Sequence, residues 1–179
     1  VGNAYPHKNL ENLIKAFLKV KDSLASLQND NLKLILSGKE NYFWRKILMD
    51  SRWSLPRTTI RGGNDIVYTG YVTDEELVAL YKNASVYVEP SLEEGFGLPI
   101  LEAMSLGCPV VTSDIGVLKE VGGEAAIYFD PHNIDDISNK ILHVLNNVSV
   151  QKSLIEKGKK RVKLFSWKKM AEQTLEVYR

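Results

Sequence analysis

Residues 85–112 have the sequence SVYVEPSLEEGFGLPILEAMSLGCPVVT, two short apolar runs separated by a glycine-rich loop and a helical pattern. Strands are predicted at residues 85–88 and 109–112. A helix is expected from Pro99, because proline suits a first helical turn, and Gly107 suits the position just past the helix end. This order predicts a strand–loop–helix–strand unit, the building block of a parallel sheet covered by helices.

Apolar strands and helices alternate on both sides of this stretch. Apolar runs without a polar residue at every second position are typical of strands buried on both faces. The fold class is therefore predicted as α/β, an open, Rossmann-like, doubly wound parallel sheet, in which ligands bind outside the carboxyl ends of the strands. The other strands are expected at residues 32–36, 65–69 and 126–129, and the other helices at residues 9–27, at 41–53 and after a Thr73/Glu76 capping box.

The last part of the chain is predicted to be helical only. Helices are expected at residues 133–147 and 150–164, and a final helix begins after its cap, Ser166. We therefore expect one domain over residues 1–179, with a helical tail from about residue 150. Five basic residues lie in the run 157–163, which is interpreted as a solvated helix face in preference to a membrane-binding one.

Composition excludes several classes of function. Lys plus Arg is 23 and Asp plus Glu is 22, so no global positive field exists to hold nucleic acid, and a bound anion needs a local site. The single cysteine, Cys108, excludes an internal disulfide and a cysteine-rich metal site, and it is expected to be a small core residue. The sequence has no apolar run of about eighteen residues and no signal pattern, so a cytoplasmic location is expected.

The loop before Pro99 is a candidate anion site. A helix that begins there points unpaired backbone N–H groups at the strand ends, and Gly95 and Gly97 let a phosphate approach the backbone closely. Lys8, in the turn before the first helix, is expected at the same sheet edge. Its ammonium can neutralise a diphosphate there.

Glu94 and Glu102 lie before this helix and about one turn inside it. Carboxylates repel phosphate but accept hydrogen bonds from hydroxyls, so a ligand with hydroxyls at both ends and phosphate between them fits the pattern. A nucleoside diphosphate sugar is such a ligand. The alternative, that the helix dipole stabilises one glutamate and solvent surrounds the other, stays open from the spacing alone.

Two further sequence patterns have simpler explanations than a functional one. The aromatic residues Tyr42, Phe43 and Trp44 form either a stacking platform or, as we prefer, part of a helix packed on the core. A dinucleotide-dependent oxidoreductase needs a Gly-x-Gly-x-x-Gly turn after its first strand, and residues 2–6 do not supply one. The oxidoreductase interpretation is therefore set aside.

Residues 94–102 also match a known motif, in which seven residues separate two glutamates. The inner residues Gly-Phe-Gly-Leu-Pro and the Glu-Ala-Met that follows are similar to those of retaining glycosyltransferases of the large family 4. The chain resembles that family over essentially its whole length. Further matching stretches are PHKNL at residues 6–10, GYV at 70–72, SDIG at 113–116 and FSW at 165–167.

The resemblance implies a two-domain GT-B enzyme of which this chain is the C-terminal, donor-binding domain, with the N-terminal acceptor domain absent. The first three residues, which look like the end of a strand and its turn, agree with missing upstream sequence. The implied reaction moves a sugar such as mannose or glucose from a nucleoside diphosphate sugar to a glycan or a lipid-linked acceptor in polysaccharide biosynthesis. No metal and no cofactor beyond the donor are expected, and the complete protein can work at the inner face of a membrane.

The resemblance also implies roles for individual residues. Glu94 and Lys8 are the implied catalytic residues, because Glu94 contacts hydroxyls of the transferred sugar and Lys8 stabilises charge on the departing diphosphate. Glu102 is implied to bind the ribose. Donor contacts are further implied for the backbone of Gly95, Phe96, Gly97 and Leu98, for Tyr71 and Val72 at the base, and for Gly38.

Asn3 departs from the family pattern. Many members carry an arginine there that pairs with the lysine on the diphosphate, so half of the cationic clamp is missing or supplied from elsewhere. The departure bears on donor affinity and donor class more than on the fold. A non-catalytic, GT-B-like binding or scaffold subunit therefore stays open as the alternative function.

Overall fold

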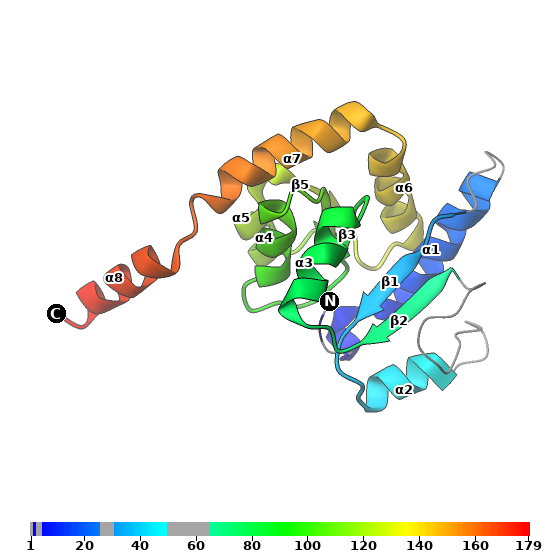
Figure 1. Ribbon diagram of the computed structural model, residues 1–179, viewed down its shortest axis with the longest axis horizontal. Helices are drawn as coiled ribbons and strands as arrows, with labels where there is room; N and C mark the ends of the chain where they lie inside the picture. Colours follow the sequence, from blue (N-terminus) through cyan, green and yellow to red (C-terminus); the bar gives the residue numbers. More distant parts are fainter. Residues whose placement is uncertain (1, 3–4, 26–30, 50–64) are drawn as a thin grey trace.

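The computed structural model describes residues 2, 5–25, 31–49 and 65–179 of the 179-residue chain (Figure 1). Helices and strands alternate up to residue 129, and only helices follow, as expected. In order, the elements are η1 (Pro6–Lys8), α1 (Leu10–Ala25), β1 (Leu34–Ser37), α2 (Tyr42–Met49), β2 (Ile66–Gly70), α3 (Asp74–Asn83), β3 (Tyr87–Glu89), α4 (Leu98–Ser105), β4 (Val110–Ser113), α5 (Gly116–Gly122), η3 (Gly123–Ala125), β5 (Ala126–Phe129), α6 (Ile134–Leu145), α7 (Val148–Val162) and α8 (Trp167–Val177).

All the described strands pair in parallel, which confirms the predicted α/β class. They form two sheets, because β1 pairs with β2, and β3, β4 and β5 pair in that order. A cavity of about 550 Å³ separates the sheets and is lined by residues of β1 on one side and β3 on the other. Gly2 lines this cavity as well, and its amide donates to the carbonyl oxygen of Ser37 at the end of β1.

Strand β4 shows why both faces of its sheet need covering. Val110 is fully buried in a cluster with residues of α4 and α5, whereas Val111 is fully buried in a cluster with residues of α1 and α6. Neighbouring side chains of a strand point to opposite faces, so helices cover this sheet on both sides. That arrangement is the doubly wound one, and it leaves the carboxyl ends of the strands open for a ligand.

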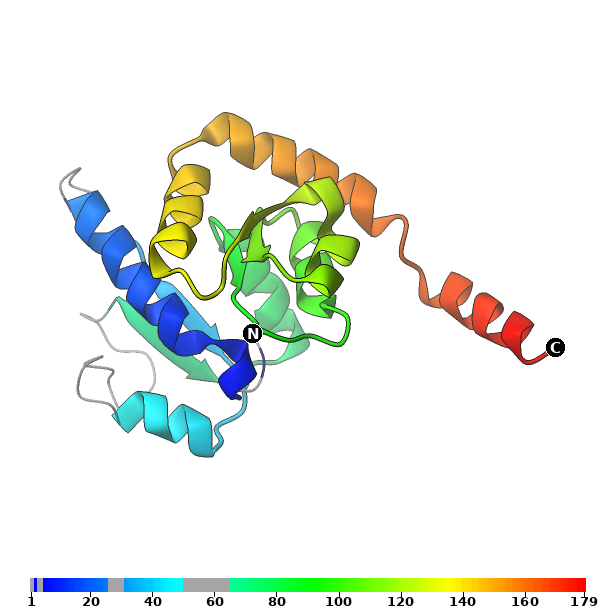
Figure 2. The same cartoon turned by 180° about the vertical axis from the view of Figure 1, so that it is seen from behind.

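Helix packing follows the apolar stripes of the sequence. Ile14, Phe17 and Val20 of α1 are buried in one cluster with Ile137 and Ile141 of α6, and the two helices lie side by side in Figure 2. Burying an apolar stripe of this size against a second helix is the main source of helix stability in a folded protein.

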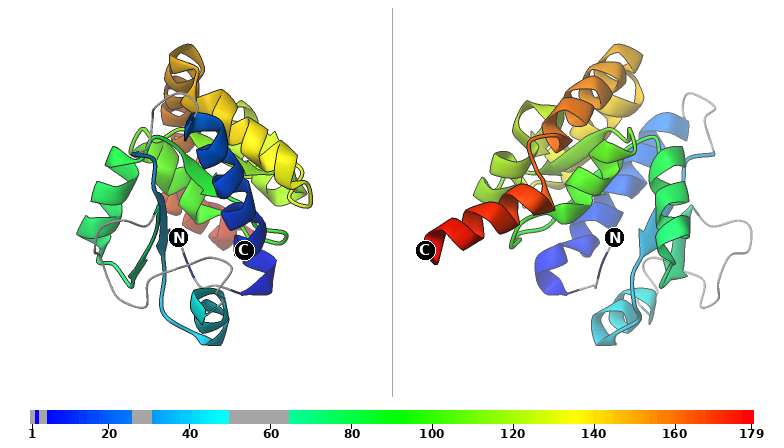
Figure 3. Two further views of the ribbon diagram at one scale, coloured as in Figure 1. Left: turned by 90° about the vertical axis from the view of Figure 1, so that its right-hand side faces the viewer. Right: turned by 60° about the vertical axis from the view of Figure 1, so that its left-hand side comes forward.

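Helix α7 crosses α4 closely. A Cβ atom at Gly158 would lie 3.1 Å from the Cγ atom of Met104, so glycine permits the approach. Helix α8 has no buried residue and projects away from the body of the chain (Figures 1 and 3). No helix in the described part of the chain is both long and apolar enough to cross a membrane.

Most predicted elements lie within two residues of their observed bounds. The Thr73/Glu76 capping box and the Ser166 cap are confirmed. Trp44 is 1% exposed, which confirms core packing at that position, although Tyr42 is 74% exposed. Helix α5 was not predicted. The later part of the expected 41–53 helix, the loop at 54–64 and Asn3 lie outside the described residues.

Candidate functional site

The site begins at the start of α4. Gly97 is the N-cap of this helix with φ of 93°, and a Cβ atom there would lie 2.7 Å from Leu118 Cδ2. Glycine is therefore required at 97 by conformation and by space. A Cβ atom at Gly95 would meet no heavy atom within 4 Å, so the space beside this residue is open for a ligand. Phe96 and Leu98 are both exposed.

Lys8 is held against the loop that follows β3 by its neighbours in sequence. Asn9 has a left-handed backbone with φ of 53°, and its Nδ2 donates to the carbonyl oxygens of Pro90 at 3.1 Å and Pro131 at 2.8 Å. The amide of Leu92 donates to the carbonyl oxygen of His7 at 2.7 Å. These bonds fix η1 at the carboxyl end of β3, as the sequence predicted for Lys8.

Two carboxylates share the Lys8 ammonium. The Nζ atom of Lys8 contacts Glu94 Oε1 and lies 4.0 Å from Glu89 Oε1. The side chain of Glu89 is 3% exposed and that of Glu94 14%. The Lys8–Glu94 pair joins two of the predicted site residues directly.

Sequence reasoning missed Glu89. The available signal was its position, since an acid that directly follows an apolar run lies at the carboxyl end of a buried strand, where ligands bind. Its Oε2 atom accepts a hydrogen bond from the Tyr87 hydroxyl at 2.6 Å, and its Oε1 atom lies 2.5 Å from the Ser91 hydroxyl. That hydroxyl also lies 2.9 Å from Glu94 Oε1. Glu89 is thus part of the same cluster as the predicted residues.

Glu102 lies one turn inside α4, as predicted, and is exposed. The hydroxyl of Tyr81 donates to its Oε2 atom at 3.3 Å, and the Tyr81 ring meets the Tyr87 ring edge-on, with centroids 5.4 Å apart. Burial raises the pKa of both tyrosines, and the carboxylates of Glu102 and Glu89 raise it further. Both hydroxyls therefore stay protonated and act as donors to these glutamates.

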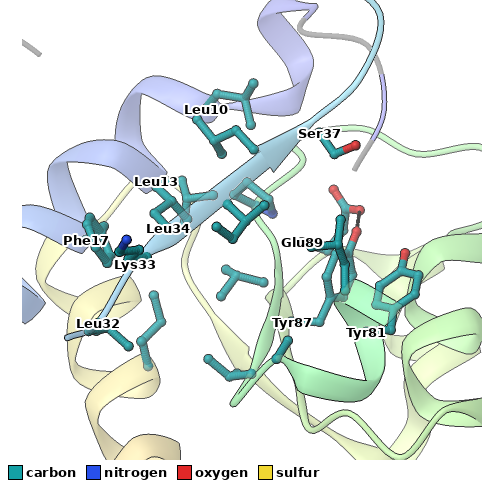
Figure 4. Close-up of a pocket in the computed structure, with 18 of the residues that line it drawn as sticks. Leu10, Leu13, Phe17, Leu32, Lys33, Leu34, Ser37, Tyr81, Tyr87 and Glu89 are labelled. Carbon is teal, nitrogen blue, oxygen red and sulfur yellow. Dashed lines mark hydrogen bonds between the residues drawn. The ribbon is translucent and has the colours of Figure 1, made fainter. Parts of the chain in front are cut away.

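Figure 4 shows Tyr81, Tyr87 and Glu89 side by side at the cavity between the sheets. Lys8, Ser37 and Glu89 are among the residues that line this cavity, and most of its other lining residues are apolar. Glu94 and Glu102 do not line it. The predicted site residues are therefore divided, because Lys8 lines the cavity whereas Glu94 and Glu102 lie outside it, near the start of α4.

The predicted base-binding residues lie at the ends of β1 and β2. The amide of Gly38 donates to the carbonyl oxygen of Gly70 at 3.0 Å, and a Cβ atom at Gly38 would overlap the carbonyl oxygen of Gly2. Gly38 therefore has a structural reason to be glycine, in addition to any contact with a ligand. Tyr71 is 68% exposed with the Lys39 ammonium 5.5 Å from its ring centroid, and Val72 is partly exposed beside it.

The arrangement suits an extended ligand with an anionic centre. The helix start offers unpaired N–H groups, Lys8 offers an ammonium once Glu94 releases it, and Glu94 and Glu102 offer acceptors for hydroxyls. In the described residues no group of three or more His, Cys, Asp or Glu side chains is placed to hold a metal ion.

Comparison with known proteins gives concordant matches. The family model described as "Glycosyl transferases group 1" matches residues 1–161. O-antigen chain mannosyltransferase B of Escherichia coli is 40% identical over 179 residues, which are 100% of this chain and 44% of that protein. MMP alpha-(1->4)-mannosyltransferase of Mycolicibacterium hassiacum is 41% identical over 122 residues, 65% of this chain and 30% of that protein.

A solved structure is similar over the whole chain. Sucrose-phosphate synthase from Thermosynechococcus elongatus superposes with a TM-score of 0.79 and 28% identity, covering 100% of this chain and 43% of that one. TarM, at 22% identity and a TM-score of 0.76, shares the fold. The chain thus spans less than half the length of these proteins.

Proposed function

The chain belongs to the group 1 glycosyl transferases, and on that premise we propose that it is the donor-binding domain of a retaining, two-domain GT-B hexosyltransferase. The proposed domain covers residues 1–179, with α7 and α8 as its helical tail. The acceptor would be bound by a second domain, in line with the greater length of the similar proteins. The observation that carries the proposal is the Lys8–Glu94 pair beside the exposed start of α4.

In the proposed reaction an acceptor hydroxyl oxygen forms a bond to the anomeric carbon of the sugar, and the bond from that carbon to the diphosphate breaks. The diphosphate leaves with the bonding electron pair, and the hydroxyl proton passes to it or to solvent. Negative charge therefore grows on the diphosphate in the transition state. Lys8 and the amides of residues 95–98 are the groups that stabilise this charge, because the main chain that carries them is fixed at the carboxyl end of β3 and at the start of α4.

In this proposal Glu94 and Glu102 bind the two ends of the donor. Glu94, next to Lys8, accepts hydrogen bonds from hydroxyls of the sugar, and Glu102 accepts from the ribose. Tyr71, Val72 and Gly38 lie at the ends of β1 and β2 and are proposed to meet the base. Because two of the similar proteins are named mannosyltransferases, mannose is the sugar that we propose.

We also propose a glycan or lipid-linked acceptor, reached from the cytoplasmic side of a membrane. The basic run 157–163, most of which lies in helix α7, is not part of this proposal as a membrane contact. Its Arg161 donates to the carbonyl oxygens of Glu120 and Val121, and its Lys157 lies 3.5 Å from Glu124. These basic side chains are therefore engaged within the chain.

Calorimetry on the 179-residue chain tests donor binding with a panel of uridine, guanosine and adenosine diphosphate sugars. We expect at least one to bind, and binding of none would contradict the proposal. In the complete enzyme, Glu94→Gln separates a transferase from a non-catalytic scaffold. In a transferase the substitution removes most of the rate of sugar transfer, whereas in a scaffold it leaves the function unchanged.

A further inference from the structure

Glu89 is the only acidic or basic residue among the buried residues of the described part of the chain. A buried carboxylate is costly unless hydrogen bonds and a counter-ion compensate it. Glu89 has both, namely the hydroxyls of Tyr87 and Ser91 and the ammonium of Lys8. Its main chain is fixed as well, because its carbonyl oxygen accepts from Thr112 Oγ1 at 3.2 Å and Ser113 Oγ at 3.3 Å.

Glu89 and Glu94 compete for the same two donors. The Ser91 hydroxyl has one proton and lies within hydrogen-bond distance of both carboxylates, so it can serve only one at a time. The Lys8 ammonium lies next to both. Glu94 is the more exposed of the two and lies in a loop, whereas Glu89 is fixed at the end of a strand.

The proposed function requires Lys8 and Glu94 to separate, because one binds the diphosphate and the other binds the sugar. A lysine side chain has four rotatable bonds, so an ammonium released by Glu94 is poorly oriented unless a second acceptor holds it. Glu89 is the acceptor within reach. Its side chain is 3% exposed and that of Lys8 17%, so a ligand has more access to Lys8 than to Glu89.

We propose that Glu89 is a positioning residue, which holds the Lys8 ammonium toward the departing diphosphate when Glu94 turns to the sugar. This role rests on the proposed function. A structural residue would stabilise the fold whether or not Lys8 is present. Glu89 is instead proposed to act through Lys8, and mainly in the transition state, where the charge on the diphosphate is greatest.

The test uses the complete enzyme with kcat and donor KM measured for wild type, E89Q, K8M and the double variant. Glutamine keeps the size of Glu89 and removes its charge. We expect E89Q to lower kcat about tenfold or more with a donor KM within about threefold of wild type. In the K8M background the same change has no further effect on kcat, because the residue through which Glu89 acts is gone.

Several outcomes overturn the role of Glu89. If E89Q lowers kcat equally in the wild-type and K8M backgrounds, Glu89 has a structural role. If kcat of E89Q is unchanged or raised, the negative charge of Glu89 only repels the leaving group. If E89Q fails to fold, E89D takes its place in the test. Aspartate keeps the negative charge but has a shorter side chain, which moves the carboxylate away from Lys8. A kcat of E89D equal to that of wild type contradicts the role. Absence of transfer by wild type with every donor removes the proposed function, and the inference with it.

Discussion

The ammonium of Lys8 contacts the carboxylate of Glu94 across 86 residues of sequence, joining η1 to the loop before α4. Each of these residues is proposed to bind a different part of the donor. In the structure they contact each other. On the proposed function, donor binding opens this ion pair, and Glu94 competes with the diphosphate for Lys8.

Glu94→Gln is expected to strengthen binding of a nucleoside diphosphate that lacks the sugar. The change frees Lys8 and removes a negative charge beside the diphosphate, so the Kd falls by about threefold to tenfold. Sugar transfer by the complete enzyme falls at the same time. Glu93→Gln is the matched control, because Glu93 is exposed and has the same charge. Equal Kd values for the two variants in calorimetry would contradict the competition.

Glu102→Ala is expected to weaken nucleoside diphosphate binding about tenfold, the value of one charged hydrogen bond at an exposed position. Binding of inorganic pyrophosphate stays unchanged, since it has no ribose. Tyr81→Phe removes the hydroxyl that orients Glu102 and is expected to have a smaller effect in the same direction. A parallel loss of pyrophosphate affinity in Glu102→Ala would place this residue at the phosphates instead.

Gly97→Ala is expected to lower the free energy of unfolding by about 1–3 kcal/mol, because alanine is strained at a positive φ and its Cβ atom meets Leu118. Gly95→Ala is the control and changes this free energy by less than about 0.5 kcal/mol, since its Cβ atom projects into open space. Urea unfolding of both variants measures the difference. Similar stabilities would show that the backbone at 97 relaxes without cost.

Cys108 is expected to resist thiol reagents in the folded chain. It is 2% exposed, and burial raises the pKa of its thiol to about 12. An unfolded thiol ionises near pH 8.5, so the free energy of unfolding is maintained below about that pH and falls as the pH rises above it. Labelling with a disulfide reagent at pH 8 should be at least about 100-fold slower without urea than with it. Comparable rates in both conditions would contradict the burial.

The sequence predicted the parts of the fold that depend on neighbouring residues. The start of α4 and the position of Glu102 one turn inside it follow from glycine, proline and helical spacing, and the structure places both where expected. Helix α5 was missed because glycines at both of its ends dilute its apolar pattern. The order in which the strands pair concerns contacts between distant segments, which periodicity does not specify.

The contacts among the candidate site residues could not be predicted from the sequence. Lys8 and Glu94 were both named from local patterns, yet their ion pair depends on the hydrogen bonds of Asn9 to the loops at Pro90 and Pro131. Glu89 was missed because an acid in a strand sequence looks like an exposed residue. Only the three-dimensional packing shows that the hydroxyls around it make burial tolerable.

A crystal structure of the 179-residue chain with a bound nucleoside diphosphate sugar tests the central claim most directly. We expect the diphosphate within about 3 Å of amides at residues 95–98 and of Lys8 Nζ, with Glu94 on the sugar and Glu102 on the ribose. The Lys8–Glu94 pair should then be open. A nucleotide bound elsewhere, with that pair intact and both glutamates facing solvent, would contradict the account.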